Sequence, residues 1–296
     1  MKKFAFIIAA MLGIASTSYA QGPYVQLGTG FLLGVNENMG SKINDTPTSY
    51  KERVISGSFG KGLPFGINVG YFINKNIAFE LGIGYRLGLK QNLAEINSNR
   101  SDTLFGTILT STSTTNITGK SSGLSLSPRV MITSDINEKM GLYTKIGLVF
   151  PTLGKLVTNN EETESMSTVG ASASTNTTVI VNEIKGRMAV GYMGSLGVYY
   201  KLSDRLDVWG ELTGQNLRIK GKSSEYSTYT INGADVLTLA STDAYDTKVE
   251  FENELTNNSN NEIFNPNFKP SEAKNEVSTK SNFSNIGIGL GVSFHF

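Results

Sequence analysis

The sequence offers few side chains for nucleophilic, acid–base or metal chemistry. Its 296 residues include one histidine, His295, and no cysteine. Without cysteine there are no disulfides, thiolate metal sites or cysteine nucleophiles. A mechanism that uses histidine as a base has only His295, which lies one position from the last residue. We therefore expect no enzymatic activity, no cofactor and no metal site.

Short motifs add no further chemistry. The glycine-containing runs GTGFLLG (28–34) and GIGLGV (287–292) lack the strand–loop–helix context of a nucleotide-binding loop. The segment SDINEK (134–139) lacks the glycine and final glutamate of a calcium loop. Lys and Arg number 26 against 25 Asp and Glu, a balance that argues against nucleic acid as a partner.

Seven charged residues form the remaining candidate constellation. Each alternates with bulky apolar residues and so shares a side of the chain with Gly, Ser and Asn. The seven are Glu80, Arg86, Arg129, Lys145, Arg187, Asp207 and Glu211. Counted from the nearest short connection, four of them stand at a similar height: Glu80, Arg129, Lys145 and Glu211. Because an unpaired buried charge is costly, we expect these charges to pair as an interior ion network. A gate in a narrow conductance path is the alternative.

Strands must position these residues, because the apolar side chains alternate along the chain. In residues 77–89, IAFELGIGYRLGL, every odd position is apolar and every even one is small or charged. Alternate residues of a strand share one face. The same pattern predicts eight strands, within residues 25–35, 65–73, 77–89, 124–132, 140–150, 188–200, 206–212 and 286–296.

The composition of the two faces favours strands that cross a membrane. No segment after the N-terminal region has 18 consecutive apolar residues, so we expect no transmembrane helix. A soluble sheet buries its bulky face and exposes charge. Here the polar face is mainly Gly, Ser and Asn, which suits the crowded interior of a narrow cylinder. We expect the bulky face to contact lipid.

The connections between predicted strands alternate in length. Short ones at 74–76, 134–139 and 203–205 alternate with long ones at about 36–62, 90–121, 152–185 and 219–281. Membrane barrels have short periplasmic turns and long extracellular loops. The sequence therefore predicts an all-β fold, a closed antiparallel eight-stranded transmembrane β-barrel with long extracellular loops. Alternation continues into 157–183 and the Thr-rich 103–118, so we expect the strands to extend partly above the membrane.

The first twenty residues have the order of a secretory signal peptide. Lys2 and Lys3 precede the apolar run 4–14, and small residues stand at Ser18 and Ala20. We predict cleavage after Ala20, which divides the chain into a signal peptide (1–20) and an outer-membrane β-barrel domain (21–296).

The chain resembles small outer-membrane β-barrel proteins of Gram-negative bacteria. The resemblance lies in the short turns NKN and SDR and in the ending IGIGLGVSFHF. The pattern is similar to porin-family and outer-membrane β-barrel-domain proteins common in Bacteroidota, and in architecture to OmpX, OmpW and the OmpA barrel. The resemblance implies a place in the cell outer membrane, among its lipids and lipopolysaccharide. Val292, Phe294 and Phe296 are similar to the C-terminal signal that the barrel assembly machinery recognises.

Two strands carry residues that fit the pattern poorly. Pro128 lies inside a predicted strand, where it lacks a donor for the ladder, so we expect a bulge there. Gly210 and Gly214 take lipid-facing positions while Trp209 points inward, and this predicts a second bulge.

Two functions from different classes remain open. The first is a non-enzymatic structural or surface-binding role, in which a long loop contacts an external partner. Loop 219–281, with ten acidic residues and six lysines, is the candidate for that contact. Two further barrel strands in this loop are not expected, because VLTLA and KVEFENEL lack a long apolar face. The second function is a narrow channel or transporter for small or apolar solutes.

Overall fold

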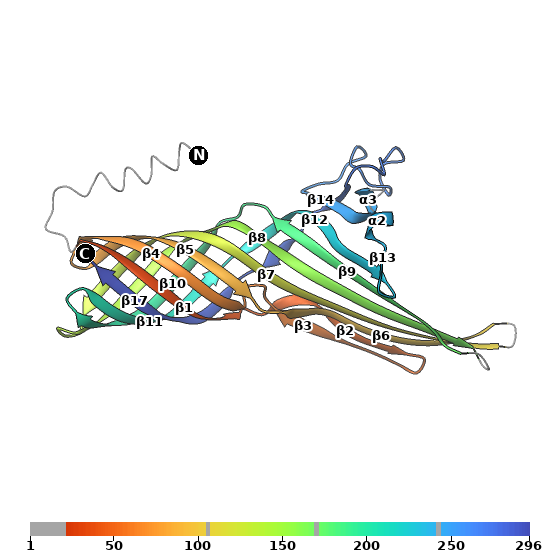
Figure 1. The fold of residues 1–296 in the computed structure, drawn as a ribbon, viewed down its shortest axis with the longest axis horizontal. Helices are drawn as coiled ribbons and strands as arrows, with labels where there is room; N and C mark the ends of the chain where they lie inside the picture. Colours follow the sequence, from red (N-terminus) through yellow and green to blue (C-terminus); the bar gives the residue numbers. More distant parts are fainter. Residues whose placement is uncertain (1–21, 105–106, 169–171, 241–243) are drawn as a thin grey trace.

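The computed structural model describes residues 22–104, 107–168, 172–240 and 244–296, and it shows an elongated all-β molecule (Figure 1). The predicted signal peptide, 1–20, lies outside the described residues. The described part holds seventeen strands, where the sequence pattern predicted eight. Eight of these strands pair one with the next in a barrel-like ring, and each segment predicted from alternation overlaps one of them. They are β1 (Pro23–Gly34), β4 (Gly62–Asn74), β5 (Ile77–Gly88), β7 (Thr107–Asp135), β8 (Met140–Thr168), β10 (Gly191–Ser203), β11 (Leu206–Asn216) and β17 (Asn285–His295).

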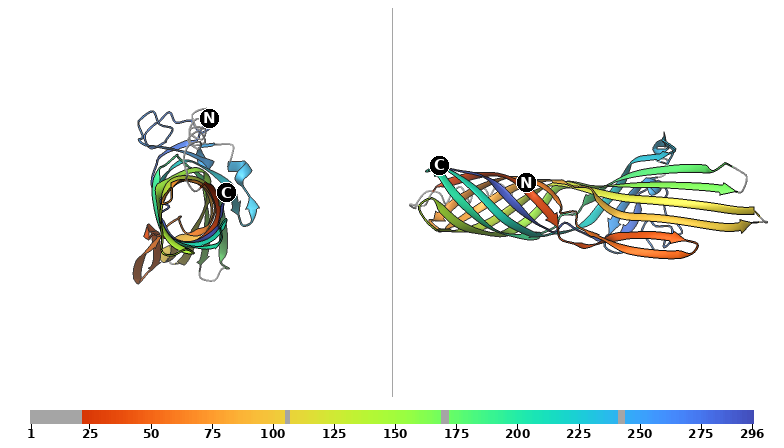
Figure 2. Two further views of the ribbon diagram at one scale, coloured as in Figure 1. Left: turned by 90° about the vertical axis from the view of Figure 1, so that its left-hand side faces the viewer. Right: turned by 90° about the horizontal axis from the view of Figure 1, so that it is seen from below.

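Antiparallel pairing runs around this ring. It leads from β1 through β4, β5, β7, β8, β10 and β11 to β17. The last strand, β17, also pairs with β1, from Tyr24 opposite His295 to Gly34 opposite Asn285. Viewed along its length, the molecule shows these strands as a barrel-like ring (Figure 2). The three short connections lie at the end where β17 finishes, as the sequence predicted (Figure 1).

The remaining strands build an extension beyond the other end of the ring (Figure 1). β7 and β8 are 29 residues long and run from the ring into this extension. β6 pairs with the first part of β7, β9 with the last part of β8, and β12 with β9. The extension consists of β2 (Glu37–Thr46), β3 (Ser49–Gly57), β6 (Gln91–Leu104), β9 (Ser174–Gly186), β12 (Arg218–Ile231), β13 (Ala234–Asp235), β14 (Lys248–Glu252), β15 (Lys274–Val277) and β16 (Lys280–Asn282), with the short helices α2 (Leu237–Ala240) and α3 (Ala244–Thr247).

The long connections are thus not simple loops, which corrects the expectation from the sequence. Strands continue the wall beyond the ring, as the polar alternating segments predicted. Region 219–281, expected to be a loop, contains most of β12, then β13 to β15 and the start of β16. Its segments VLTLA and KVEFENEL hold α2 and β14, and neither joins the ring.

Both predicted bulges are wrong in position. β7 and β8 keep one register on the two sides of Pro128, where two rungs are missing because proline has no donor. Their register shifts between Leu124 and Ser125 instead. β11 pairs with β17 without any shift near Trp209. The inward indole fits because Gly28 and Gly291 face it, and a Cβ on either glycine would overlap the ring.

Bulky apolar residues cover the outside of the ring. Leu196 and Leu290 are 66% and 59% exposed, and similar residues recur on all eight ring strands. Inside, buried side chains form two clusters. One lies toward the short turns and includes Tyr24, Tyr143 and Trp209. The other lies where the ring meets the extension and consists of Phe59, Val149, Leu156, Leu217 and Phe283.

Candidate functional site

A cluster of ionised side chains crosses the interior of the ring, centred on Glu80 of β5. Glu80 Oε1 forms an ion pair with Lys145 Nζ at 3.1 Å and accepts a hydrogen bond from Tyr24 Oη at 2.8 Å. Its Oε2 lies 3.3 Å from Arg129 Nε. Lys145 is only 1% exposed, and its Nζ also lies 3.8 Å from Glu211 Oε2. The structure therefore brings together the four residues that the sequence placed at one height.

Neutral side chains complete this interior cluster. Gln26 Oε1 accepts a hydrogen bond from Lys145 Nζ at 2.7 Å, and Asn68 Oδ1 accepts one from Arg129. Tyr143 Oη donates to Glu211 Oε2 at 3.0 Å. Gln26 and Asn68 share the inward alternate position of the charged residues, so the same alternation could have identified them. Sequence reasoning missed them because it considered charged residues only.

The charges of the cluster balance. Two carboxylates, Glu80 and Glu211, face two cations, Arg129 and Lys145, and donors and acceptors from β1, β4, β5, β7, β8 and β11 fill the space around them. Lys145 Nζ also lies 4.9 Å from the centre of the Tyr143 ring, within reach of a cation–π interaction. An eight-stranded ring has room for little more than its own side chains. This arrangement can hold the ring together and obstruct its lumen.

The other three predicted residues do not join this cluster, which corrects the expectation of one network of seven. Arg86 lies six residues further along β5, about 20 Å at 3.3 Å per residue. Asp207 Oδ2 lies 2.8 Å from His295 Nε2. Arg187 lies in the link between β9 and β10, where it bonds to the Phe251 carbonyl and lies 3.5 Å from Glu252. The alternation of strand residues cannot predict the direction of the Arg187 side chain, because Arg187 lies outside the strands.

The C-terminal strand of the ring pairs with the first strand. Val292, Phe294 and Phe296 are exposed on its outer side. The His295 ring packs against Tyr24, with centroids 5.6 Å apart, and against Phe72. These contacts give His295 a structural place at the seam. Recognition of the last strand by the assembly machinery stays a prediction.

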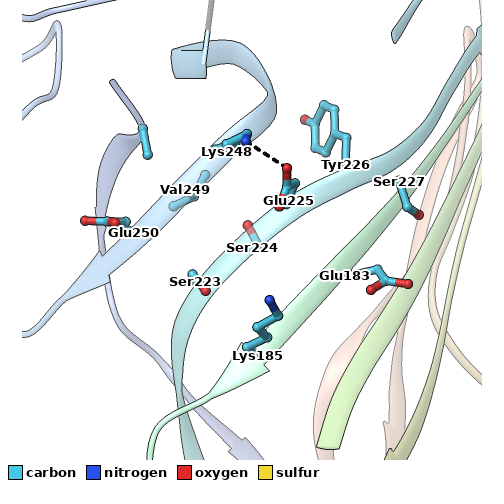
Figure 3. A pocket seen from close by; sticks show the side chains of 11 residues that line it. Glu183, Lys185, Ser223, Ser224, Glu225, Tyr226, Ser227, Lys248, Val249 and Glu250 are labelled. Atoms are coloured by element: carbon cyan, nitrogen blue, oxygen red, sulfur yellow. Dashed lines mark ion pairs between the residues drawn. The ribbon is translucent and has the colours of Figure 1, made fainter. Parts of the chain in front are cut away.

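The extension carries a polar pocket of about 440 Å³ between β9, β12 and β14 (Figure 3). Glu225 and Lys248 form an ion pair across it at 2.9 Å, and Glu183 pairs with Lys155. Tyr226 lies on its rim, and burial raises the pKa of this phenol. The carboxylates Glu183 and Glu225 are thus each paired with a lysine, and Glu250 is the remaining carboxylate of the lining.

Among the described residues, no group of three His, Asp or Glu side chains is placed to hold a metal ion. Over the same ranges, no helix is long and apolar enough to cross a membrane.

The fold and its interior define a class: an all-β protein with a barrel-like ring, apolar outside and filled with paired polar groups inside. A family model, the OmpA-like transmembrane domain, matches residues 41–211, more than half of the chain. The chain belongs to this family. The crystal structure of Neisserial surface protein A (NspA) is similar at 11% identity, with 94% of this chain and 100% of that chain covered and a TM-score of 0.38. A search of the curated proteins finds no match.

Proposed function

We propose that the ring is a closed eight-stranded barrel that spans the outer membrane and has a non-enzymatic structural or surface-binding role. The observation that carries this proposal is the exposed apolar exterior of the ring. Such a surface is unfavourable in water and suits the acyl chains of a bilayer. Pairing of β17 with β1 joins the last strand of the ring to the first, so neither of these two strands is a free edge facing lipid.

The orientation follows from the connections. In barrels of this kind the short turns face the periplasm and the long connections face outward. We assign the extension to the cell surface on that basis, with lipopolysaccharide and outer-membrane lipid around the ring. The barrel assembly machinery would insert the chain, with Val292, Phe294 and Phe296 in its recognition segment.

The extension supports a surface role because it is a large, mostly polar structure that leaves the ring. It ends at one side in β3, which pairs with β2 and carries the exposed residues Tyr50 and Val54. Region 219–281 adds a net negative surface. An extracellular partner that binds through this region is our proposal for the contact.

The alternative role is a narrow channel for small solutes, and an interior cluster that obstructs the lumen argues against it. Single-channel recording of the purified protein in planar bilayers tests whether the lumen is closed. We expect no steady conductance from the wild type or from Glu37→Ala, which removes only an exposed pair with Arg218. Steady conductance through the wild-type protein would contradict a closed lumen and favour the channel.

A further inference from the structure

The wall of the ring is interrupted between β8 and the link that joins β9 to β10. Pairing of β8 with β10 ends at Val149 opposite Gly191, and pairing of β8 with β9 begins at Lys155 opposite Lys185. Residues 150–154 of β8 pair with neither strand, although all of them except Thr152 still pair with β7 on the other side. On the facing link, Arg187 N donates to the Lys220 carbonyl of β12 instead. The described wall thus has a lateral gap.

Apolar side chains flank this gap on both sides. Leu153 of β8 is 71% exposed and Met188 of the link is 86% exposed. Along the same strands toward the short turns, Leu148 and Tyr192 belong to the apolar exterior. The gap therefore opens at the edge of the surface that we assign to lipid, on the side of the extension.

A cavity of about 540 Å³ lies behind the gap and is lined by Leu153 and Met188 themselves. Its inner wall includes Val149, Leu156 and Phe283 of the junction cluster. Its size is within the range of ligand pockets in proteins. Its charged lining residues are all basic: Arg86, Lys155, Lys185, Arg187, Lys220 and Lys222.

Four of these cations have no ion pair among the described residues, and Arg86 is the one of them with a buried nitrogen that lacks a partner. Lys185 and Lys222 are exposed, and Lys220 donates to Asn253. Lys155 and Arg187 have carboxylate partners, Glu183 and Glu252. Among the described residues, no carboxylate lies within 4 Å of the Arg86 guanidinium, which contacts Ser121 Oγ at 3.3 Å and the Phe283 ring at 5.4 Å. Its Nε is buried without a hydrogen-bond partner there. A buried guanidinium without a counter-charge destabilises the folded protein unless an anion binds beside it.

We propose that this cavity binds the carboxylate of a single-chain fatty acid, with Arg86 as its anion partner and the acyl chain leaving through the lateral gap into the outer leaflet. A guanidinium can bind a carboxylate with two parallel hydrogen bonds. The Glu80 cluster lies about six residues below Arg86, about 20 Å along β5, and obstructs the lumen there. The feature is thus a binding site without a through passage. It rests on the proposed placement of the ring in the outer membrane, goes beyond the surface role, and does not depend on an extracellular partner.

Electron paramagnetic resonance of doxyl-labelled stearate, with the protein reconstituted in phosphatidylcholine bilayers, tests the proposal. With the label at carbon 5, near the carboxylate, we expect a saturable immobilised component. Arg86→Met should weaken this binding about tenfold or more, because a charge-assisted pair is lost. Arg205→Met, at an exposed turn on the opposite end of the ring, should leave it unchanged. With the label at carbon 16 the spectrum should stay mobile.

The chemistry of the probe separates the outcomes. Methyl stearate with the same label should fail to compete, and so should inorganic phosphate. Equal competition by the methyl ester would overturn recognition of the carboxylate, and equal competition by phosphate would show an ion site without a lipid. Unchanged binding by Arg86→Met would also overturn the proposal. None of these results depends on the conductance measurement, so the two proposals fail separately.

The gap itself can be tested with single introduced cysteines, because the sequence has none of its own to be modified. Met188→Cys, modified with a bulky maleimide after reconstitution, should slow uptake of the carbon-5 probe at least tenfold. Val54→Cys on β3, modified in the same way, should not change it. Equal uptake rates by the two modified proteins would overturn entry through the gap.

Discussion

At the scale of single residues, Glu80 is the centre of the ionised cluster inside the ring. It is the carboxylate that Lys145, Arg129 and Tyr24 share, and it is buried with them. Such a group is stabilising only while its partners remain, because the dehydration of each charge is offset by the opposite one. Removal of one member therefore costs more than the interaction itself contributes.

We expect Glu80→Gln to lower the free energy of unfolding by about 3–5 kcal/mol, because Lys145 and Arg129 then share too little negative charge in a buried place. Urea unfolding of the reconstituted protein measures this change. Glu37→Gln is the matched control, since its pair with Arg218 is exposed and should contribute less than about 1 kcal/mol. Equal effects of the two substitutions would contradict the role given to Glu80.

A second prediction compares an inward-facing glycine, Gly70, with a lipid-facing one, Gly214. A Cβ at Gly70 would overlap the Tyr24 ring, whereas a Cβ at Gly214 has no atom within 4 Å. Gly70→Ala should therefore destabilise the protein by about 1–3 kcal/mol through overpacking. Gly214→Ala should be neutral or slightly stabilising. The same urea titration compares them, and a neutral Gly70→Ala would show that Tyr24 is free to move.

The sequence allowed the charged part of the interior to be predicted, because alternation assigns each strand residue to one face. It placed Glu80, Arg129, Lys145 and Glu211 at one height, and these four residues lie together in the structure. Arg187 was misplaced because the strand ends before it. The bulge assigned to Pro128 was wrong because a missing donor can be tolerated by leaving two rungs unpaired. That choice depends on the partner strand, which alternation does not reveal.

At the scale of elements, the strands of the ring and those of the extension differ in the side chains on their two faces. Ring strands have one face toward the lumen and one covered with bulky apolar residues, so their period-two signal is strong. In β6, β9 and the outer parts of β7 and β8, Ser, Thr and Asn occur on both faces. Neither face needs to be apolar there, so the signal weakens. This is why eight strands were predicted and the separate strands of the extension were not.

The two sets of strands should respond differently to an outward charge. Leu290→Arg on β17 should lower the stability of the inserted protein by about 2–4 kcal/mol, as expected for a cation at the bilayer midplane. Val54→Arg on β3 is the control, because Val54 is 62% exposed and belongs to the extension. Unfolding from lipid vesicles measures both. A neutral Leu290→Arg would contradict a lipid-facing β17.

At the scale of the whole molecule, the distribution of side chains is inverted relative to a soluble protein. Large apolar residues surround the ring, and paired charges occupy its centre. This inversion could be predicted from the sequence because the small and charged residues share one face. The lateral gap could not be predicted from the sequence, since it depends on where β10 and β9 each stop pairing with β8.

Site-directed spin labelling tests the lipid-facing exterior most directly. Single cysteines at Ile67, Ile146, Leu196 and Leu290 would be labelled in lipid bilayers, with Val54→Cys as the reference. We expect collisions with molecular oxygen to dominate at the four ring positions, and collisions with a water-soluble nickel complex to dominate at Val54. Ready access of the nickel complex to the ring positions would show that water surrounds the ring, and the account of a membrane barrel would then be wrong.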